Sequence, residues 1–293
     1  MKKVLLLAVS LACAVTMNSQ NKIDIQGHRG CRGLMPENTI PAFLKALDLG
    51  VRTLELDVVV TKDRQVLVSH DHYMNAAFCL DPSGQPIARE KQEEYNLYRM
   101  TMDEIRKFDC GSLPHEKFPG QHKMKVTKPL LSEVIDAVEN HVTQHGLPPA
   151  LYNIEIKCSP EGDNLWHPTP EVMTDLVLKV MDEKGITGKS NIQSFDVRPL
   201  QYLHKIRPEI TTAFLIMNVK SMKQNLEKLG YLPDTYSPYY RLAGKKLLRD
   251  VHALGMTLVP WTVNEVKDIR KMIRLRVDGI ISDYPDRVLV QVK

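Results

Sequence analysis

Residues 53–60, TLELDVVV, place two carboxylates two positions apart in a stretch that is otherwise apolar or β-branched. In a β-strand, residues i and i+2 point to the same face, so Glu55 and Asp57 would lie side by side. The sequence NIEIK further along the chain repeats this spacing with Glu155 and Lys157. Carboxylates grouped in a partly buried site either share protons, which raises their pKa values, or hold a cation.

The donor atoms indicate which cation such a group would bind. Oxygen ligands without cysteine, and without a histidine pair at strand spacing, favour Mg²⁺ or Ca²⁺ over zinc. We therefore expect Glu55, Asp57 and Glu155 to bind one divalent cation, Mg²⁺ or Ca²⁺. The alternative is a set of interior salt bridges with Lys157 and Arg52, since buried charges can simply be paired.

Two histidines follow other extended stretches of the chain. His28 lies in GHRG at 27–30, between glycines that let the backbone approach a ligand closely, and His70 follows the sequence VLVS. Imidazole titrates near neutral pH, so one of the two can act as general acid and the other as general base.

The charges of these groups suggest the substrate. Three carboxylates and a divalent cation sum to −1, and Arg29 and Lys157 bring the site to +1 when both histidines are neutral. A phosphodiester carries −1 and would bring the total to zero. Arg29 can bind two phosphate oxygens at once and Lys157 acts as a point charge, while a bound cation would polarise a third oxygen.

The elements that must position these residues alternate between short apolar stretches and amphipathic helical patterns. Repeated βα order implies a parallel sheet, and about eight units in roughly 270 residues fit a single (β/α)₈ TIM barrel. Such barrels carry their catalytic residues at the C-terminal ends of the strands, where Gln193, Trp261 and Asn264 would also line the site. The expected strands are residues 23–28, 53–60, 66–71, 151–157, 191–196, 211–216, 257–263 and 278–283, with a weaker candidate near 235–237.

One interval, between the third and fourth expected strands, is too long for a crossover. It holds about 80 residues, whereas a crossover needs little more than a helix and two short loops. An amphipathic helix at about 132–144 accounts for part of it. The remainder, about 71–128, is polar and rich in turn formers, and carries a capping box at Thr101 and Glu104. We expect a small insertion after the second barrel strand, lying over the site.

The N-terminal segment, residues 1–20, is predicted to be a signal peptide. Lys2 and Lys3 precede an apolar run of about a dozen residues, which is shorter than the roughly 20 apolar residues of a membrane span. An Ala-Cys-Ala sequence around Cys13 resembles a cleavage site, but Cys13 could instead be the lipid-modified cysteine of a bacterial lipoprotein. We expect an exported protein that is periplasmic or is anchored to a membrane only through Cys13. Its catalytic barrel is expected to span residues 23–293.

Composition excludes some classes of partner and leaves one pairing open. The 293 residues are 43% hydrophobic and 25% charged, as in soluble globular proteins. The formal charge of +4 falls to +2 without the two N-terminal lysines, and the basic residues are too scattered for nucleic acid or a polybasic membrane surface. Cys79 and Cys110 could pair in an oxidising compartment, but buried thiols fit their spacing equally well. The sequence therefore leaves this pairing undecided.

Taken together, these stretches resemble the glycerophosphodiester phosphodiesterase family, a set of metal-dependent (β/α)₈ barrels. The matches lie in order over nearly the whole chain after the N-terminal segment. They depart from the family pattern modestly, with Cys31 after the HRG, Cys158 after Lys157, and Ser282 where threonine is frequent. The matching stretches are GHRG (27–30), PENT (36–39), LELDVVVTKD (54–63), SHD (69–71), NIEIK (153–157), QSF (193–195), WTVN (261–264) and DGIISDYPD (278–286).

The resemblance implies an activity and a set of roles. The activity is hydrolysis of a small-molecule glycerophosphodiester to glycerol 3-phosphate and an alcohol, by water or by the neighbouring glycerol hydroxyl through a cyclic phosphate. The resemblance also implies that the insertion helps to bind the glycerol end. It does not decide which histidine is acid and which is base; we favour His70 as base and His28 as acid. The implied metal ligands are Glu55, Asp57 and Glu155, the acid–base pair His28 and His70, and the phosphate-binding cations Arg29 and Lys157.

Three other functions are compatible with parts of this pattern. His70-Asp71-His72 contains an H-x-H pair like that of amidohydrolase-type enzymes, but later strand ends offer Gln193 and Asn264 where further histidines would be needed. A non-catalytic exported binding protein could use the same barrel, because fold does not fix function. A phospholipase-like phosphodiesterase acting on intact lipids would use the same chemistry.

Overall fold

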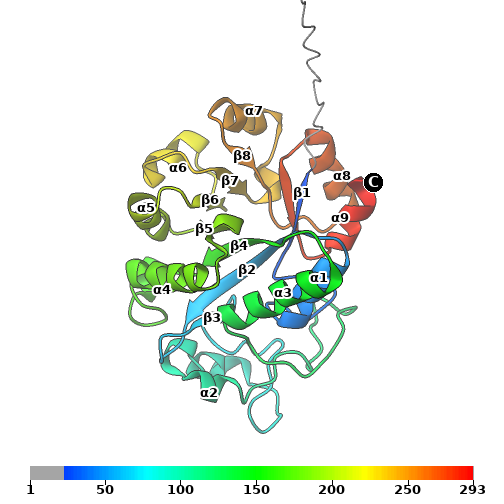
Figure 1. The fold of residues 1–293 in the computed structure, drawn as a ribbon, viewed down its shortest axis with the longest axis vertical. Helices are drawn as coiled ribbons and strands as arrows, with labels where there is room; N and C mark the ends of the chain where they lie inside the picture. The colour runs from blue at the N-terminus through cyan, green and yellow to red at the C-terminus, as the bar shows by residue number, and fades with distance from the viewer. Residues whose placement is uncertain (1–22, 293) are drawn as a thin grey trace, which may run out of the picture.

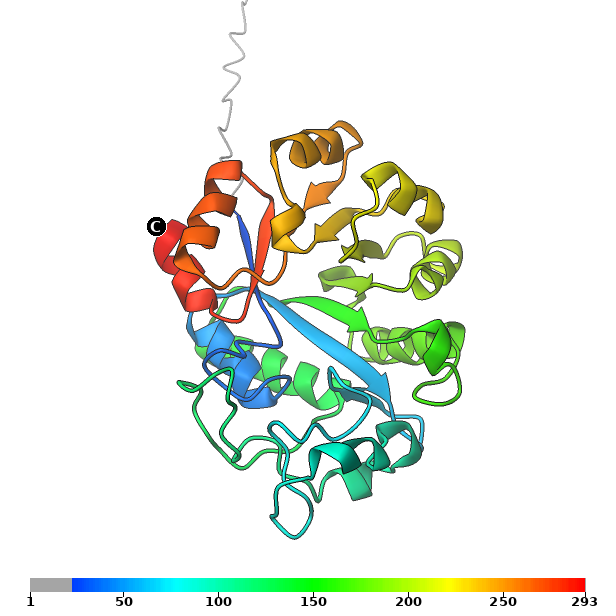
Figure 2. The ribbon, with the colours of Figure 1, turned by 180° about the vertical axis from the view of Figure 1, so that it is seen from behind.

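A sheet of parallel strands forms the centre of the molecule, and helices surround it (Figures 1 and 2). The computed structural model describes residues 23–292, so the predicted signal peptide and Cys13 lie outside the described residues. The strand order is β8-β7-β6-β5-β4-β2-β1-β9, with β3 (Val66–Val68) paired to β2 off this path. The predicted (β/α)₈ barrel with an insertion after its second strand is confirmed. Its parallel strands are β1 (Asp24–Gly27), β2 (Thr53–Val60), β4 (Leu151–Ile156), β5 (Ser190–Ser194), β6 (Thr211–Ile216), β7 (Thr235–Pro238), β8 (Thr257–Leu258) and β9 (Gly279–Ser282).

Amphipathic helices cover the outer face of this sheet. In Figure 1, α4 to α7 follow one another along one side of the barrel, and α1, α3, α8 and α9 lie on the other. Their apolar faces pack on the strands, which is why every residue of β2 is buried. The helices are α1 (Ile40–Asp48), α3 (Leu131–His145), α4 (Pro170–Glu183), α5 (Val197–Ile206), α6 (Met222–Leu229), α7 (Lys245–Ala253), α8 (Val266–Leu275) and α9 (Pro285–Val292). No helix among residues 23–292 is long and apolar enough to cross a membrane.

Three strands differ from the sequence-based expectation. The weak candidate near 235–237 is a full strand, β7, which pairs with both β6 and β8. The expected strand at 257–263 is reduced to β8, because Pro260 has no N–H to continue the ladder. The stretch at 66–71 contains β3 (Val66–Val68), which is antiparallel to β2 and is not a strand of the barrel.

The barrel closes between β8 and β9 without a regular ladder. The Asp278 N–H donates to the Leu258 carbonyl at 3.0 Å, and the Ile281 N–H donates to the Pro260 carbonyl at 3.1 Å. These bonds occupy backbone groups that β9 would otherwise leave unpaired at the edge of the sheet.

The insertion connects β3 to α3 and lies beside the barrel, below β2 and β3 in Figure 1. It contains α2 (Met102–Ile105), which begins with the predicted capping box of Thr101 and Glu104. The insertion also has a small apolar core of its own, which includes Val59 of β2 and Leu67 of β3.

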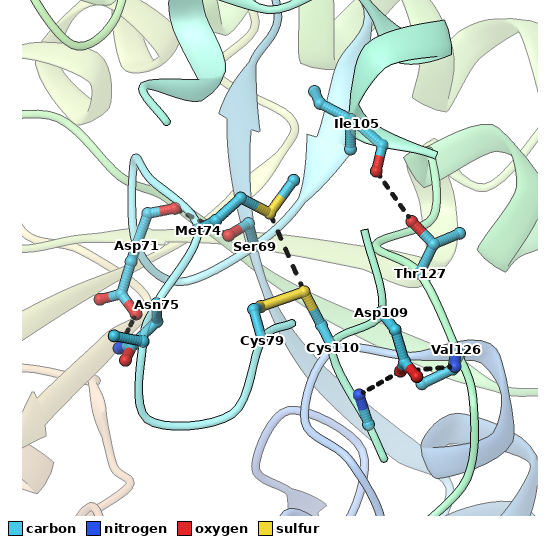
Figure 3. Close-up of a disulfide and its surroundings, with 12 residues drawn as sticks. Ser69, Asp71, Met74, Asn75, Cys79, Ile105, Asp109, Cys110, Val126 and Thr127 are labelled. Atoms are coloured by element: carbon cyan, nitrogen blue, oxygen red, sulfur yellow. Dashed lines mark hydrogen bonds between the residues drawn. A yellow bond between two sulfur atoms is a disulfide. The ribbon is translucent and has the colours of Figure 1, made fainter. Parts of the chain in front are cut away.

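A disulfide between Cys79 and Cys110 connects two parts of the insertion across a sequence separation of 31 residues (Figure 3). The pairing that the sequence leaves undecided is therefore formed. Asp109, next to Cys110, accepts hydrogen bonds from the N–H groups of Gly111 at 3.0 Å and Val126 at 3.3 Å. Backbone folding around Asp109, which sequence spacing does not report, brings Cys110 to Cys79.

Candidate active site

The three acidic residues singled out in the sequence lie together at the C-terminal ends of adjacent strands. In the register of β2 and β4, Asp57 is opposite Glu155, and Glu55 lies two residues before Asp57 on the same face. One carboxylate oxygen from each residue lies within 4.8 Å of the other two, and all three side chains are buried.

The surroundings of this cluster fit a bound cation. The Asp57 Oδ1 atom is buried and has no hydrogen-bond partner among the described residues, an arrangement that a metal ion would satisfy. Burial, together with the negative charges of Asp57 and Glu155, raises the pKa of Glu55 well above its usual value. Burial also raises the pKa of Glu155. A divalent cation would offset this repulsion, and the all-oxygen donor set is of the kind that Mg²⁺ and Ca²⁺ prefer.

Basic side chains neutralise part of the carboxylate cluster but leave Asp57 Oδ1 without a hydrogen bond. Lys157 Nζ lies 2.7 Å from Glu155 Oε1 and 3.7 Å from Asp57 Oδ1. Arg52, the other cation considered for interior salt bridges, is exposed and donates to the Pro149 carbonyl at 3.3 Å. Salt bridging with Arg52 therefore does not explain why the carboxylates are grouped.

The GHRG segment follows β1 and turns sharply into the site. A side chain at Gly27 would come within 2.1 Å of the Gly30 carbonyl oxygen, and Gly30 has a φ of +85° with Ala42 packed against it. Both positions therefore require glycine. Arg29, between them, also has a positive φ of 51°, and its N–H donates to Glu55 Oε2 at 2.9 Å.

Each histidine of the expected acid–base pair has its Nδ1 atom against a carboxylate. His28 Nδ1 lies 2.5 Å from Asp283 Oδ1, and His28 Nε2 is 3.9 Å from Glu55 Oε2. His70 Nδ1 lies 2.9 Å from Asp71 Oδ1, and Asn75 donates to the other oxygen of Asp71 at 2.7 Å. A carboxylate at Nδ1 fixes the ring orientation and leaves Nε2 to exchange a proton.

The two imidazoles differ in their exposure to solvent. The side chain of His28 is 11% exposed, whereas that of His70 is 33% exposed. Burial lowers the pKa of His28 to about 4, although the nearby Asp283 opposes this shift.

A chain of ion pairs connects Asp283, the partner of His28, to the carboxylate cluster. Asp283 accepts from Arg32 Nε at 3.0 Å, and Arg32 Nη1 lies 3.5 Å from Glu37. Glu37 accepts from Arg29 Nη1 at 2.7 Å, and Arg29 Nε lies 3.2 Å from Asp57 Oδ2. The guanidinium of Arg29 is therefore held in place by acidic residues at the edge of the cleft.

The PENT sequence supplies contacts that the sequence-based reasoning did not assign. Glu37 pairs with Arg29, and Asn38 donates from Nδ2 to Asp57 Oδ2 at 2.9 Å. Thr39 is the N-cap of α1, where its side chain accepts from the Ala42 N–H. The sequence shows PENT only as a match to the family pattern, and the contacts of Glu37 and Asn38 depend on the fold.

These groups surround one cleft of about 180 Å³ at the mouth of the barrel. Gln193 and Trp261 line it as expected. Asn264 does not: its Nδ2 donates to Asp283 Oδ2 at 2.7 Å, so it supports the partner of His28 instead of contacting the cleft. The lining residues are His28, Arg29, Arg32, Glu55, His70, Glu155, Lys157, Gln193, Phe195, Leu215, Trp261, Thr262 and Ile281.

A second, larger cleft of about 720 Å³ adjoins the first and shares Arg29, Arg32 and His70 with it. Apart from Glu37, its other lining residues come from the insertion, including Phe78 beside the disulfide and His115. The insertion therefore forms one side of the entrance to the site.

Comparison with known proteins gives the same family over nearly the whole described chain. Residues 28–287 match the model of the glycerophosphoryl diester phosphodiesterase family. The chain is 30% identical over 274 residues to a glycerophosphodiester phosphodiesterase of Caldanaerobacter subterraneus subsp. tengcongensis, covering 93% of this chain and 98% of the relative. It is 31% identical over 268 residues to one of Bacillus altitudinis, covering 90% and 96%.

Solved structures agree with these relatives. A crystal structure from Silicibacter pomeroyi DSS-3, described as a candidate glycerophosphoryl diester phosphodiesterase, superimposes with a TM-score of 0.81 at 30% identity, covering 92% of each chain. The fold, the buried acidic cluster that could bind a metal, and these relatives lead to one assignment. The chain belongs to the glycerophosphoryl diester phosphodiesterase family and is an enzyme of the glycerophosphodiester phosphodiesterase class.

Proposed function

We propose that the protein hydrolyses glycerophosphodiesters to glycerol 3-phosphate and an alcohol in a metal-dependent reaction, with His28 and His70 as its acid–base pair. The observation that carries this proposal is the grouping, around one cleft, of buried carboxylates, two imidazoles oriented by carboxylates, and two cations. Each of these groups has a use in cleaving a phosphodiester.

The cation site is formed by Glu55, Asp57 and Glu155, with Mg²⁺ or Ca²⁺ as the bound ion. Such an ion polarises a phosphate oxygen and offsets the negative charge that develops during cleavage. Asp57 Oδ1, which is buried without a hydrogen bond, supports a direct role for Asp57 as ligand. Gln193 Nε2 donates to Glu55 Oε1 at 2.8 Å and would orient that ligand.

The phosphate group lies between the two cations in this proposal. Lys157 and Arg29 both line the cleft, from the segments that follow β4 and β1. Each is already paired with an acidic residue of the site, which fixes its position before the substrate arrives. Pre-positioned charges stabilise a transition state without the cost of reorganisation.

The imidazoles exchange protons through their Nε2 atoms. One accepts the proton of the attacking hydroxyl, from water or from the neighbouring glycerol, while the other protonates the leaving alkoxide. If a cyclic phosphate forms, the two exchange roles when water opens it. The greater exposure of His70 supports the sequence-based preference for His70 as the first base, because its proton can then pass to solvent.

We also propose that the protein is exported, as the pattern of residues 1–20 predicts. The Cys79–Cys110 disulfide supports this, because disulfides persist in oxidising compartments and are rare in the cytosol. Lipidation of Cys13 stays a sequence-based prediction.

The test of the proposed function is product analysis on a panel of substrates. Glycerophosphodiesters with different alcohols, and intact phospholipids beside them, are incubated with the enzyme, and the products are identified by phosphorus NMR. Release of glycerol 3-phosphate from the water-soluble diesters is the expected result. Cleavage of intact phospholipids alone would replace this proposal with the phospholipase-like activity, and cleavage of neither would contradict both.

A further inference from the structure

Large apolar side chains are exposed on the loops around the mouth of the barrel. We call these residues the apolar rim: Leu165, Phe195, Met217, Val219 and Leu242. They follow β4, β5, β6 and β7, so they lie on four consecutive loops at the face where the cleft opens. Val219 is 98% exposed and Met217 is 67% exposed. Exposed apolar groups gathered at one face mark an interaction surface.

Aromatic rings connect the cleft to this rim. Phe195 and Trp261 line the cleft, with ring centroids 5.3 Å apart. The ring centroid of Tyr239 lies 5.9 Å from that of Trp261 and 4.9 Å from that of Tyr240. Tyr240 and Leu242 belong to the same short segment after β7, so an aromatic row extends from the site to the rim.

A small apolar groove lies at the outer end of this row, between the loops that follow β6 and β7. Its volume is about 170 Å³, and Lys220 is the charged residue in its lining. A groove of this size is too small to hold a helix or strand of another protein, but it is suited to a few methylene groups. Its lining residues are Ile216, Asn218, Val219, Lys220, Met222, Tyr236, Pro238, Leu242 and Leu247.

Although basic residues are scattered along the sequence and acidic residues lie beside Leu165 and Phe195, the charges beside Met217, Val219 and Leu242 have one sign. Residues 217–226 and 239–249 contain no acidic residue; their charged side chains are Lys220, Lys223, Arg241, Lys245, Lys246 and Arg249. Some of these have partners further along their helices, such as Asp250 for Lys246 at 2.7 Å. The described structure shows no ion pair for Lys220 or Arg241, which lie beside Val219 and Leu242.

We propose that the apolar rim docks the catalytic face of the protein on an anionic lipid surface. Met217 and Val219 would enter the acyl boundary, while Lys220 and Arg241 would contact anionic head groups. Exposed apolar side chains flanked by basic residues are the combination that binds proteins to the surface of such a membrane. The cleft would then open toward the lipid. This docking goes beyond the proposed function and does not depend on it.

Vesicle binding by the full chain tests this inference. Affinity for vesicles of phosphatidylglycerol and phosphatidylcholine is measured by sedimentation for the wild type, for Met217→Ser/Val219→Ser, and for Leu232→Ser/Val290→Ser. The last variant is the matched control, since Leu232 and Val290 are also exposed but lie away from the rim, after α6 and on α9. Residues 1–20 are the same in all three proteins, so any binding through them cancels in the comparison.

We expect the rim variant to bind about tenfold more weakly than wild type, because two apolar side chains no longer enter the lipid. The control variant should stay within about twofold of wild type, and added salt should weaken wild-type binding because it screens the basic residues. Turnover of a water-soluble diester should be the same in wild type and rim variant, which separates loss of docking from damage to the site.

Two results would overturn the inference. One is unchanged vesicle affinity in the rim variant, or an equal loss in the control. The other is that light scattering shows a dimer for wild type and a monomer for the rim variant, while neither protein binds vesicles. The rim would then be a contact between two copies of the chain. Failure of wild type to hydrolyse any glycerophosphodiester would contradict the proposed function while leaving the vesicle result standing.

Discussion

Gln193 connects the carboxylate cluster to a row of amides inside the barrel. Its Nε2 donates to Glu55 Oε1 at 2.8 Å, and its Oε1 accepts from Asn153 Nδ2 at 3.1 Å. Asn153 also donates to Gln26 Oε1 at 2.7 Å and accepts from Asn191 Nδ2 at 2.7 Å. Because every amide in this row has a neighbouring partner, the orientation of the Glu55 carboxylate is fixed from within the barrel.

Replacement of Gln193 by leucine should therefore weaken cation binding. Loss of a group that orients a metal ligand typically lowers metal affinity about 10- to 100-fold. Isothermal titration with Mg²⁺ and with Ca²⁺ measures this effect. Asn191→Ala is the control, because it removes a more distant amide of the same row, and it should change the affinity little. Equal affinities in wild type and Gln193→Leu would show that Glu55 needs no such support.

Asp283 orients His28, so Asp283→Asn should lower kcat with a smaller change in KM. The asparagine keeps the shape of the side chain but removes the charge that stabilises a protonated imidazole. A positioned acid or base contributes about 10²- to 10⁴-fold, so we expect a loss near the lower end of that range and an altered pH–rate profile.

The control for this variant is Asp278→Asn at the other end of β9, where Asp278 pairs with His252 at 2.8 Å. It should leave the pH–rate profile unchanged. A purely structural role for Asp283 would instead lower stability in Asp283→Asn and leave the profile of the remaining activity as in wild type.

Residues of the site differ in how far the sequence can predict them. Glu55 and Asp57 are visible because their spacing of two in an apolar run is unusual for a buried strand. Asp283 and Glu37 have no such local signal. Asp283 and His28 are 255 positions apart in the chain. Glu37 contacts Arg29 because the turns that precede α1 bring both residues to the ends of the strands. The position of Asn264 at the end of an expected strand predicts that it lines the cleft, although its side chain donates to Asp283.

At the scale of elements, the insertion is held by the Cys79–Cys110 disulfide. Closing a loop of this length removes conformational freedom from the unfolded chain and is worth about 3–4 kcal/mol. Cys79→Ala/Cys110→Ala should therefore unfold at lower urea concentration than wild type. Cys158→Ala, which removes a thiol outside the disulfide, is the control and should unfold close to wild type. An unchanged urea midpoint in the double variant would mean that the insertion's apolar core holds it without the disulfide.

A strand can be predicted from the sequence when its own residues carry the pattern of a strand, and not when its neighbours in the sheet determine its pairing. Strands with long apolar runs, such as β2, β4 and β6, lie where the sequence places them. β7 is short and carries Thr235 and Ser237, so its strand character comes from burial between β6 and β8 rather than from its own pattern. The antiparallel pairing of β3 could not be predicted, because an extended stretch does not report the direction of its partner.

At the scale of the whole molecule, the proposed cation site would couple metal binding to stability and pH. Burial raises the pKa of Glu55 and of Glu155 above the values of the unfolded chain. For an acid with a raised pKa, the folded state binds the proton more tightly. The metal-free protein therefore loses stability as pH rises from about 4.5 through the raised pKa values.

A bound cation should reverse this loss. At 100 times its dissociation constant a ligand adds about 2.7 kcal/mol, which corresponds to an increase of roughly 5–10 °C in Tm. We expect such an increase with Mg²⁺ or Ca²⁺ at pH 7.5 and a smaller one at pH 5, where protonation of the carboxylates competes with the metal. Thermal unfolding with and without cation checks this, with Glu55→Gln as the control that should not respond. Equal shifts at both pH values would contradict the assignment of these carboxylates as ligands.

The most direct test of the account is hydrolysis of one water-soluble glycerophosphodiester before and after removal of metal. Chelation should abolish turnover by the wild type, and addition of Mg²⁺ or Ca²⁺ should restore it. Glu55→Ala and His70→Ala should each lose about 10²-fold or more, and added metal should not rescue His70→Ala. Turnover that survives both chelation and these substitutions would contradict the metal-dependent acid–base mechanism.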